Sequence, residues 1–308
     1  MLKITFLHIQ GRDELKNFAK DQKVNDISSK LGISSLKTFR GNFNALKNNP
    51  NIKSVEIDAE VHALPYFRGG NDEESGHQQR RLAEETPYGI NMVQSALLPP
   101  NPAGSKKICV VDTGYALGHE DLPDASYGVS GYVPSGYSGS WNVDGDGHGT
   151  HCAGTIGAIG GNGKGVTSVN PDPSKFSFFI GKGLQDNGSG STSGVMAAVT
   201  ACKDNGANVI SMSLGGGGFT DAENTLYKDL YNNDDVLIIA AAGNDVSRSC
   251  TNTFLFICHD ASFSLSLSHT HSLIAHVPSL PPTFIPGQYR LELPCFIRCR
   301  HVCSCRRF

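Results

Sequence analysis

The chain contains 308 residues, with a formal net charge of −3 and 18% charged side chains. That length suffices for one large domain or two ordinary ones, each with a buried core. The small net charge, with no basic cluster before the last fifty residues, gives no electrostatic basis for binding nucleic acid or an anionic membrane. No apolar run is long enough to span a bilayer.

Residues 1–63 are rich in lysine and asparagine and predict a small α+β unit. Within them, LKNNPNIKSVEIDAEVHAL indicates the end of a helix, an Asn-Pro turn, and a strand that alternates through Ile52, Val55 and Ile57. The first apolar stretch, about six residues long, is shorter than the apolar region of a signal peptide. Either the protein is intracellular or its true start lies upstream.

Residues 64–87 are polar and charged and contain a Gly-Gly pair, which predicts an exposed linker or processing region. The Arg80-Arg81 pair in this segment fits either a processing site or ordinary solvated charge.

Residues 88–250 alternate between predicted strands and helices. The strands are apolar runs that end in small residues, as buried parallel strands do: KICVVDTG, NVISMSLG and VLIIAAAGN. The predicted helices lie between or after them: HGTHCAGTIGAI, SGVMAAVTACKDNG and TDAENTLYKDLYNND. Asp221 is a candidate N-cap of the last helix, and Gly206 a candidate for the position after the end of the second. This order predicts an α/β fold with a mostly parallel sheet sandwiched by helices.

Residues 251–308 differ in composition from everything before them. They contain one glycine, two acidic residues and no lysine, and show no helical or strand periodicity. We expect an aberrant tail of low order, from a retained intron or a shifted reading frame. Such a tail cannot cover the predicted sheet, so one side of residues 236–242 should stay partly uncovered.

Asp112 ends the first predicted strand, in the tripeptide Asp-Thr-Gly. Functional groups gather where the strands of open α/β sheets end, although a plain strand-ending turn is the commoner use of such a tripeptide. Aspartic peptidases share the tripeptide but need two copies to pair their carboxylates. This chain contains one, which excludes that class.

His148 and His151 lie in GDGHGTHCAGT, where small residues allow a helix to begin close to other backbone segments. A histidine in the first turn can then project into a cleft, although both could be histidines without a role. Zinc is disfavoured because the spacing is not that of HExxH and no glutamate stands between them. Cys109 and Cys152, which flank Asp112 and His148, are interpreted as small buried hydrophobic residues.

Asn244 follows the third predicted strand. An asparagine there can form a turn, but its side-chain amide could also donate a hydrogen bond to developing negative charge. The glycine-rich edge SMSLGGGG could pair with an extended peptide as an added strand.

Taken in order, these segments resemble the subtilisin family of serine peptidases. The resemblance lies in CVVDTGYALGHEDL, DGHGTHCAGTIGAIGGNGKGV, NVISMSLGG and IIAAAGN, and covers roughly residues 38–247. YGINMVQSALL resembles the start of the mature domain, and LKNNPNIKSVEIDAEV the end of the inhibitory propeptide. The implied fold is the subtilisin-like sheet, incomplete here, preceded by a partial propeptide at 1–63.

The resemblance implies a role for each matching residue. Asp112 matches the triad aspartate, His148 the general base and Asn244 the oxyanion-hole donor. The substrate groove would have one wall at Ser213, Leu214 and Gly215 and the opposite wall at Ala241, Ala242 and Gly243.

A structural calcium ion is the one cofactor that the resemblance suggests, and none is required for the chemistry. Asp121 and Asn162 fall near the positions where many subtilisins bind calcium, and their oxygens suit that ion. A glycine-rich loop without a metal accounts for the same sequence.

The nucleophile is missing from the pattern. The family places its serine at a helix start in a Gly-Thr-Ser-Met-Ala type motif, and no serine after Asn244 follows Gly-Thr. The sequence therefore predicts a serine endopeptidase made as a zymogen, in the extracellular space or secretory pathway. Its partners would be polypeptide substrates and its own propeptide, and these 308 residues would be inactive as written. The alternative is a non-catalytic peptide-binding pseudo-peptidase.

Overall fold

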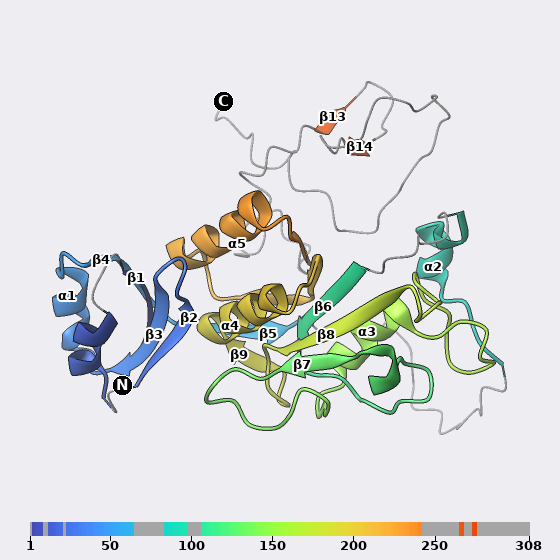
Figure 1. The fold of residues 1–308 in the computed structure, drawn as a ribbon, viewed down its shortest axis with the longest axis horizontal. Coiled ribbons are helices and arrows are strands. Elements are labelled where there is room, and N and C mark those ends of the chain that lie inside the picture. The colour runs from blue at the N-terminus through green and yellow to red at the C-terminus, as the bar shows by residue number, and fades with distance from the viewer. Residues whose placement is uncertain are drawn as a thin grey trace, which may run out of the picture.

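The computed structural model describes residues 2–8, 12–20, 23–64, 83–97 and 106–241, together with two short strands at 265–267 and 273–275 (Figure 1). No helix in these ranges is both long enough and apolar enough to cross a membrane.

The N-terminal unit is an antiparallel sheet with the strand order β2-β3-β1-β4, covered by helices. Its elements are β1 (Leu2–His8), η1 (Arg12–Phe18), β2 (Val24–Ser28), β3 (Ile33–Thr38), α1 (Asn42–Lys47) and β4 (Ile52–Ile57). Ile4, Leu36 and Leu46 are fully buried in its core. The unit has the α+β character that the sequence predicts.

The predicted alternation along β4 is wrong in one respect. Ile52 and Val55 are both buried, whereas Ile57, the last residue of the strand, is 55% exposed. The register shifts between Leu7 and His8, which pair with Ser54 and Ile52. Because this irregularity skips one residue of β4, Ile52 and Val55 can reach the same core although they are three residues apart.

In the described part of the chain, the main sheet has five parallel strands in the order β12-β10-β6-β8-β7. They are β6 (Lys106–Asp112), β7 (Ser130–Tyr132), β8 (Phe176–Lys182), β10 (Val209–Met212) and β12 (Leu237–Ala240). Helices α4 (Thr192–Asp204) and α5 (Asp221–Asn233) lie on one side and α3 (His148–Gly157) on the other (Figure 1). Short helices are α2 (Tyr88–Met92), η2 (Ser95–Leu97) and η3 (Ala125–Tyr127).

This sheet is the α/β architecture expected from the sequence, with β6 at its centre. The side chains of β6 alternate: Cys109 and Val111 belong to the core beneath α4, and Val110 to the core beneath α3. Strand β8 was not among the predicted strands, although its FSFFIGK run is apolar and buried.

Cys109 is more than a small buried hydrophobic residue, because it forms a disulfide with Cys202 of α4, with Cα atoms 5.8 Å apart. Both side chains are fully buried. The bond joins the central strand to the helix that covers it. Cys152 is a free, half-buried cysteine.

Of the two predicted helix ends, the one at Gly206 is confirmed and the one at Asp221 is wrong. Gly206 follows the C-cap Asn205 with φ of +79°, a conformation that favours glycine, so that prediction is confirmed. The N-cap of α5 is Thr220 rather than Asp221: its Oγ1 accepts a hydrogen bond from the Glu223 backbone N–H at 3.1 Å and donates one to the Glu223 carboxyl at 2.9 Å. The Thr-x-x-Glu sequence is that of a capping box, but the structure shows only its first half: the threonine side chain satisfies one backbone donor of the first turn, while the glutamate accepts from the threonine hydroxyl.

The expectations for the C-terminal part are met in part. Strand β12 exposes Leu237 and Ile239, by 41% and 38%, while Val236 is buried, so one side of this edge strand is partly uncovered as predicted. Within the tail, β13 (Leu265–Leu267) pairs antiparallel with β14 (Leu273–Ala275), a strand pair that the sequence did not predict. The other tail residues lie outside the described ranges.

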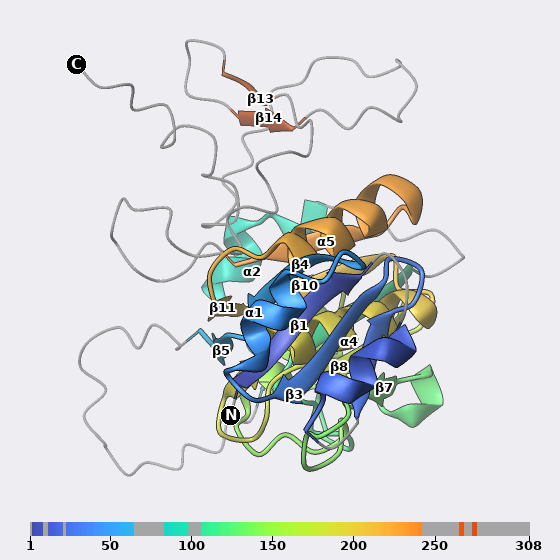
Figure 2. The same ribbon diagram turned by 90° about the vertical axis from the view of Figure 1, so that its left-hand side faces the viewer.

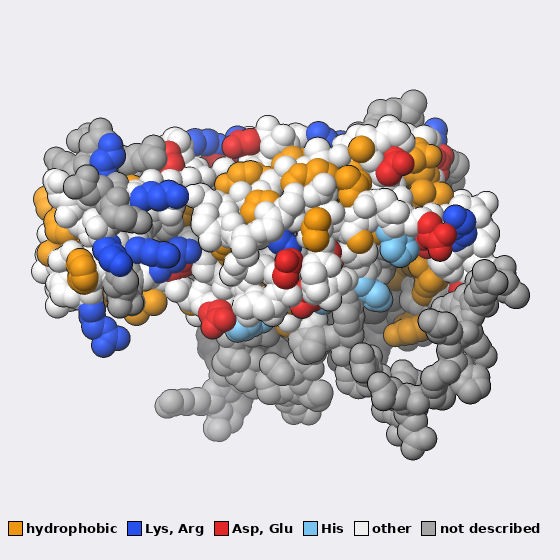
Figure 3. Space-filling model, turned by 90° about the horizontal axis from the view of Figure 1, so that it is seen from below, with side chains coloured by type: hydrophobic (Ala, Val, Ile, Leu, Met, Phe, Trp, Pro, Cys, Tyr) orange, Lys and Arg blue, Asp and Glu red, His pale blue; other side chains and the backbone are white. Residues whose placement is uncertain are grey.

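The N-terminal sheet lies against α4 and α5: it stands beside these helices in Figure 1 and in front of them in Figure 2. On the face seen in Figure 3, lysine and arginine side chains gather over the N-terminal unit, whereas charges of both signs are scattered over the rest.

Candidate active site

Asp112 is the last residue of β6, the central strand, and its side chain is fully buried. Its Oδ1 accepts hydrogen bonds from the Thr113 backbone N–H and from His148 Nδ1–H, both at 2.7 Å. Its Oδ2 has no hydrogen-bond partner among the described residues. A carboxylate at this end of a parallel sheet faces the edge where α/β proteins place their ligands.

His148 begins α3, directly after Gly147, which adopts φ of +94°. Gly149 allows the helix to start this close to β6, because a Cβ at that position would collide with the Gly114 carbonyl oxygen. The small residues around His148 therefore bring its ring against Asp112. His148 is 5% exposed, so the pair is shielded from bulk water.

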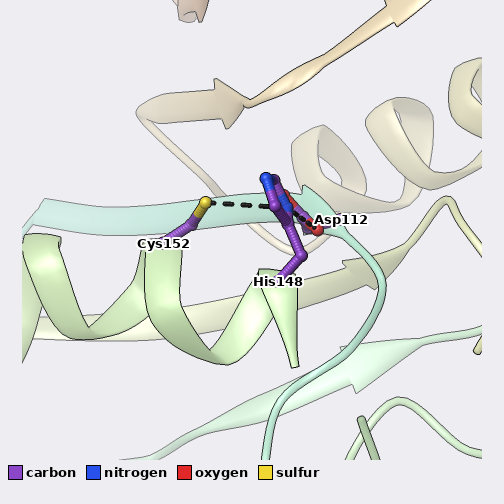
Figure 4. A group of neighbouring side chains, drawn as sticks. All are labelled: Asp112, His148 and Cys152. Carbon is purple, nitrogen blue, oxygen red and sulfur yellow. Dashed lines mark hydrogen bonds and ion pairs between the residues drawn. The ribbon is translucent and has the colours of Figure 1, made fainter. Parts of the chain in front are cut away.

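Asp112, His148 and Cys152 form one contiguous group (Figure 4). Cys152 Sγ, one helical turn after His148, lies 3.8 Å from the same Nδ1. Burial lowers the pKa of His148, but the hydrogen bond to Asp112, the Cys152 thiol and the charge of Asp112 together raise it to about 10. Asp112 thus strongly favours the protonated imidazole, as expected of an orienting carboxylate.

Asp144 connects the segment after Asp112 to the start of α3. Its carboxylate accepts hydrogen bonds from the Thr113 hydroxyl at 2.8 Å, the Gly147 N–H at 2.9 Å, and the N–H and hydroxyl of Thr150 at 2.8 and 2.6 Å. Burial raises the pKa of Asp144, but these donors outweigh burial and hold it below its usual range. One carboxylate therefore ties the residue after Asp112 to the first turn of α3.

Lys182 is a buried cation that the sequence analysis did not single out. It stands opposite Asp112 in the β6–β8 register, and its side chain is fully buried. Its ammonium donates to the carbonyls of Thr113 and Val143 and forms an ion pair with Asp186 at 2.6 Å. A buried ammonium group needs hydrogen-bond partners because burial removes its water. By contacting these partners, Lys182 connects the loops beside Asp112.

The strand predicted to line the substrate groove is paired with another segment of the same chain. Strand β5 (Glu60–Ala63) lies between β11 (Leu214–Gly216) and β9 (Ser189–Ser191) and runs antiparallel to both. Gly215 pairs with His62, and the Ser213 carbonyl accepts a hydrogen bond from the Leu64 N–H at 3.2 Å. An extended segment thus receives backbone hydrogen bonds from both sides, the geometry of strand addition.

The opposite edge of this groove comes from β9, which the sequence analysis did not assign to it. Of the three residues predicted for that wall, Ala241 donates its N–H to the Met212 carbonyl at 3.0 Å, which continues the pairing of β12 with β10. Ala242 and Gly243 lie outside the described residues, as does Asn244. The side chains of the serines after Asn244 are likewise not described.

Asp121 and Asn162 are brought together, as the calcium prediction requires. However, Asp121 Oδ1 accepts from the Asn162 amide nitrogen at 2.8 Å and Oδ2 accepts from the Val166 N–H at 2.8 Å. Asn162 turns its oxygen to the Lys164 N–H. In this arrangement the oxygens face N–H donors rather than a shared cation position, so the residues do not fit calcium as placed, and the ion stays a prediction.

Among the described residues, Asp112, His148 and Cys152 form the one group of three potential metal ligands within 4.8 Å. Two ligands of a tetrahedral zinc ion stand about 3.3 Å apart. The 2.7 Å between Asp112 and His148 is instead a hydrogen-bond distance. The pair shares a proton, which suits general-base chemistry better than metal binding.

The chain is similar to known proteins. The model of the subtilase family matches residues 104–263. A subtilisin from Bacillus sp. (strain TA39) is 36% identical over 214 residues, and subtilisin DY from Bacillus licheniformis 35% over 176. Subtilisin amylosacchariticus from Bacillus subtilis subsp. amylosacchariticus is 31% identical over 248 residues. These matches cover 66%, 56% and 80% of this chain but 48%, 60% and 61% of the relatives, so the chain spans only part of their length.

Among solved structures, fervidolysin from Fervidobacterium pennivorans, described as a keratinolytic enzyme related to subtilisin, aligns with a TM-score of 0.57 at 21% identity. The alignment covers 82% of this chain and 41% of fervidolysin. This likeness supports the fold.

Proposed function

This chain belongs to the subtilase family, and we propose that it supplies the aspartate and histidine of a serine endopeptidase of the subtilisin type. The observation that carries the proposal is the buried hydrogen bond of 2.7 Å between Asp112 and His148, at the end of the central strand. In this role His148 accepts the proton of a serine hydroxyl as it attacks the peptide carbonyl. Asp112 holds the imidazole in the required tautomer and orientation.

The Nδ1–H to Asp112 hydrogen bond leaves Nε2 as the atom that exchanges the proton with serine. Asp112 stabilises the imidazolium that forms, which agrees with the raised pKa of His148. Asn244 donates its amide to the developing oxyanion in this proposal. Loss of such a donor costs about 10²–10³ in turnover, a general magnitude that was itself established on a subtilisin.

The partner that we propose for the groove is the N-terminal unit. Residues 60–64 fill the strand position between β9 and β11, where an extended polypeptide substrate would pair. A segment that occupies this position excludes substrate, so residues 1–63 act as the inhibitory propeptide of a zymogen. Polypeptides in extended conformation are the corresponding substrates.

We place the protein outside the cell or in the secretory pathway. The support is the disulfide between Cys109 and Cys202, since structural disulfides persist in oxidising compartments.

The proposal is tested by restoring a nucleophile. Transcripts are read past codon 250 for an in-frame Gly-Thr-Ser-Met-Ala type segment, and the resulting protein is treated with a fluorophosphonate probe. We expect labelling that His148→Ala abolishes. The polypeptide of residues 1–308, which lacks that motif, should show no labelling, since loss of the serine alone costs about 10⁶ in turnover.

The pseudo-peptidase alternative makes a different prediction. If no transcript encodes the motif and an extended peptide binds when residues 60–64 are displaced, the chain is a peptide-binding protein. Labelling of the 308-residue polypeptide at any serine would contradict our assignment of the nucleophile to a segment outside it.

A further inference from the structure

Two carboxylates of the N-terminal unit bind the starts of two helices in the main domain. Asp58 accepts hydrogen bonds from the N–H and hydroxyl of Ser193, in the first turn of α4, both at 2.7 Å. Glu56 accepts from the N–H groups of Asp221 and Ala222, in the first turn of α5, at 2.5 and 3.3 Å. Helix starts attract negative charge, so these contacts favour docking of residues 52–63.

A third carboxylate, Glu223, is buried at the same interface. It lies in the first turn of α5 and is 4% exposed. Its side chain has a hydrogen bond from the Thr220 hydroxyl and no ion pair among the described residues. The buried hydroxyl of Tyr227 faces it from the next turn without meeting hydrogen-bond geometry. Glu223 thus has the burial of a core residue, and no cation in the described part of the chain forms an ion pair with it.

The charged groups around Glu223 are mostly of its own sign. Glu56 and Asp58 face it from the N-terminal unit, and Asp221 lies on its own helix. Lys3, a cation of the N-terminal unit, forms an ion pair with Asp58 at 2.7 Å. Burial raises the pKa of Glu223 to about 8; the hydroxyls of Thr220 and Tyr227 oppose this rise, and the charges of Glu56 and Asp58 add to it. Burial likewise raises the pKa of Glu56.

The positions of these carboxylates favour a proton over a metal ion as the group that offsets their charge. These carboxylates are absent from the one three-ligand group found among the described residues, so their oxygens do not converge on a common ion. Protonation removes the charge of Glu223 while its carboxyl keeps the contact with Thr220.

We propose that Glu223 is a proton-dependent latch for the N-terminal unit. While Glu223 is protonated, residues 52–63 dock on α4 and α5 and β5 stays in the groove. When Glu223 ionises, it repels Glu56 and Asp58, and β5 leaves the groove more readily. The inference rests on the proposed inhibitory role of the N-terminal unit and adds its regulation: the block is firm in acid and is released on the alkaline side.

Linkage sets the pH window. In the docked structure burial, and after it the charges of Glu56 and Asp58, raise the pKa of Glu223 above its ordinary value. Undocking removes those two charges, so the docked state binds this proton more tightly than the undocked state. The stabilisation of docking is complete below the ordinary pKa of 4.5 and is lost as pH rises through about 8. Substitution by glutamine removes the ionisation and should therefore remove the pH dependence.

Hydrogen–deuterium exchange of the 308-residue chain tests the latch, with rates corrected for the intrinsic effect of pH. Between pH 6 and pH 9, the wild type should lose at least about tenfold in protection at residues 60–63, relative to the amides of β6. Glu223→Gln should keep its protection. Glu120→Gln is the matched control, since Glu120 is exposed and pairs with Lys164 far from this interface, and it should behave as the wild type.

Each outcome has a distinct meaning. Equal loss of protection in the wild type and Glu223→Gln, or no loss in either, overturns the latch. If Glu223→Gln does not fold, Glu223→Leu, which is also uncharged and of similar volume, must give the same pH-independent protection. Residues 60–63 that are unprotected in the wild type at pH 6 would contradict the proposed block of the groove itself.

Discussion

Asp112 and Glu223 are both buried carboxylates, yet their surroundings give them opposite roles. Asp112 shares a hydrogen bond with an imidazole, and together with the Cys152 thiol it raises the pKa of His148 to about 10. Glu223 faces Glu56 and Asp58, and burial raises its own pKa to about 8. Burial penalises charge at both sites, so the neighbour determines which group carries the proton. The first pair is arranged for proton transfer and the second cluster for sensing pH.

The largest effect should follow from neutralising Asp112 in a protein with a restored nucleophile. Asp112→Asn should lower turnover by about 10⁴, because the imidazole loses the carboxylate that orients it and stabilises its charged form. Glu223→Gln, measured after removal of the N-terminal unit, should leave turnover within about twofold. The measurement is kcat on a peptide substrate. Equal losses of kcat in the two variants would contradict the assignment of proton transfer to Asp112 and of docking to Glu223.

The pKa of His148 provides a second test, which needs no nucleophile. In Asp112→Asn the burial of His148 is opposed only by the Cys152 thiol, so the pKa of His148 should fall from about 10 toward its ordinary value of 6.5. NMR titration of the imidazole in the 308-residue chain measures this shift. In a restored enzyme, turnover should rise with pH toward the pKa of His148, since only the neutral ring accepts a proton. An unchanged pKa in Asp112→Asn would show that the pair is not coupled.

Asp144 is a third carboxylate, and hydrogen-bond donors surround it. Asp144→Ala leaves four donors without their acceptor and should destabilise the fold by about 2–3 kcal/mol. Its lowered pKa means that its stabilisation is present above the ordinary pKa of 3.8 and is lost as pH falls through the lower value of the folded state. Urea unfolding at pH 7 and pH 3 measures both effects. Asp172→Ala, at an exposed aspartate with only local Ser174 contacts, is the control and should change stability little.

Glu223 should affect stability with the opposite pH dependence. Because its pKa is raised in the folded state, it contributes most below 4.5, and stability falls as pH rises through about 8. Glu223→Gln should therefore exceed the wild type in unfolding free energy at pH 9 by at most about 4–5 kcal/mol, which is the shift from 4.5 to about 8 at 1.36 kcal/mol per pKa unit, with little difference at pH 4. A wild type that is equally stable at pH 4 and pH 9 would show that Glu223 finds a compensating partner.

Much of the site could be predicted because its signals are local. Asp112 ends an apolar run, and His148 stands among glycines that permit close approach of a helix. In both cases the neighbouring residues in the sequence indicate the local backbone structure. The three predicted strands and three predicted helices are all present. The buried lysine at 182 and the N-cap at Thr220 escaped prediction because equally ordinary lysines and threonines occur on any surface.

The sequence by itself determined the family, the central strand and the residues of the proposed Asp–His pair. Only the tertiary structure decided that β5 lies between β9 and β11, that Cys109 bonds Cys202, and that Glu56 and Asp58 meet Glu223. Motifs and periodicity report the local path of the backbone. The charge state of a buried group instead depends on atoms that folding brings together from distant parts of the chain, and no local pattern encodes that neighbourhood.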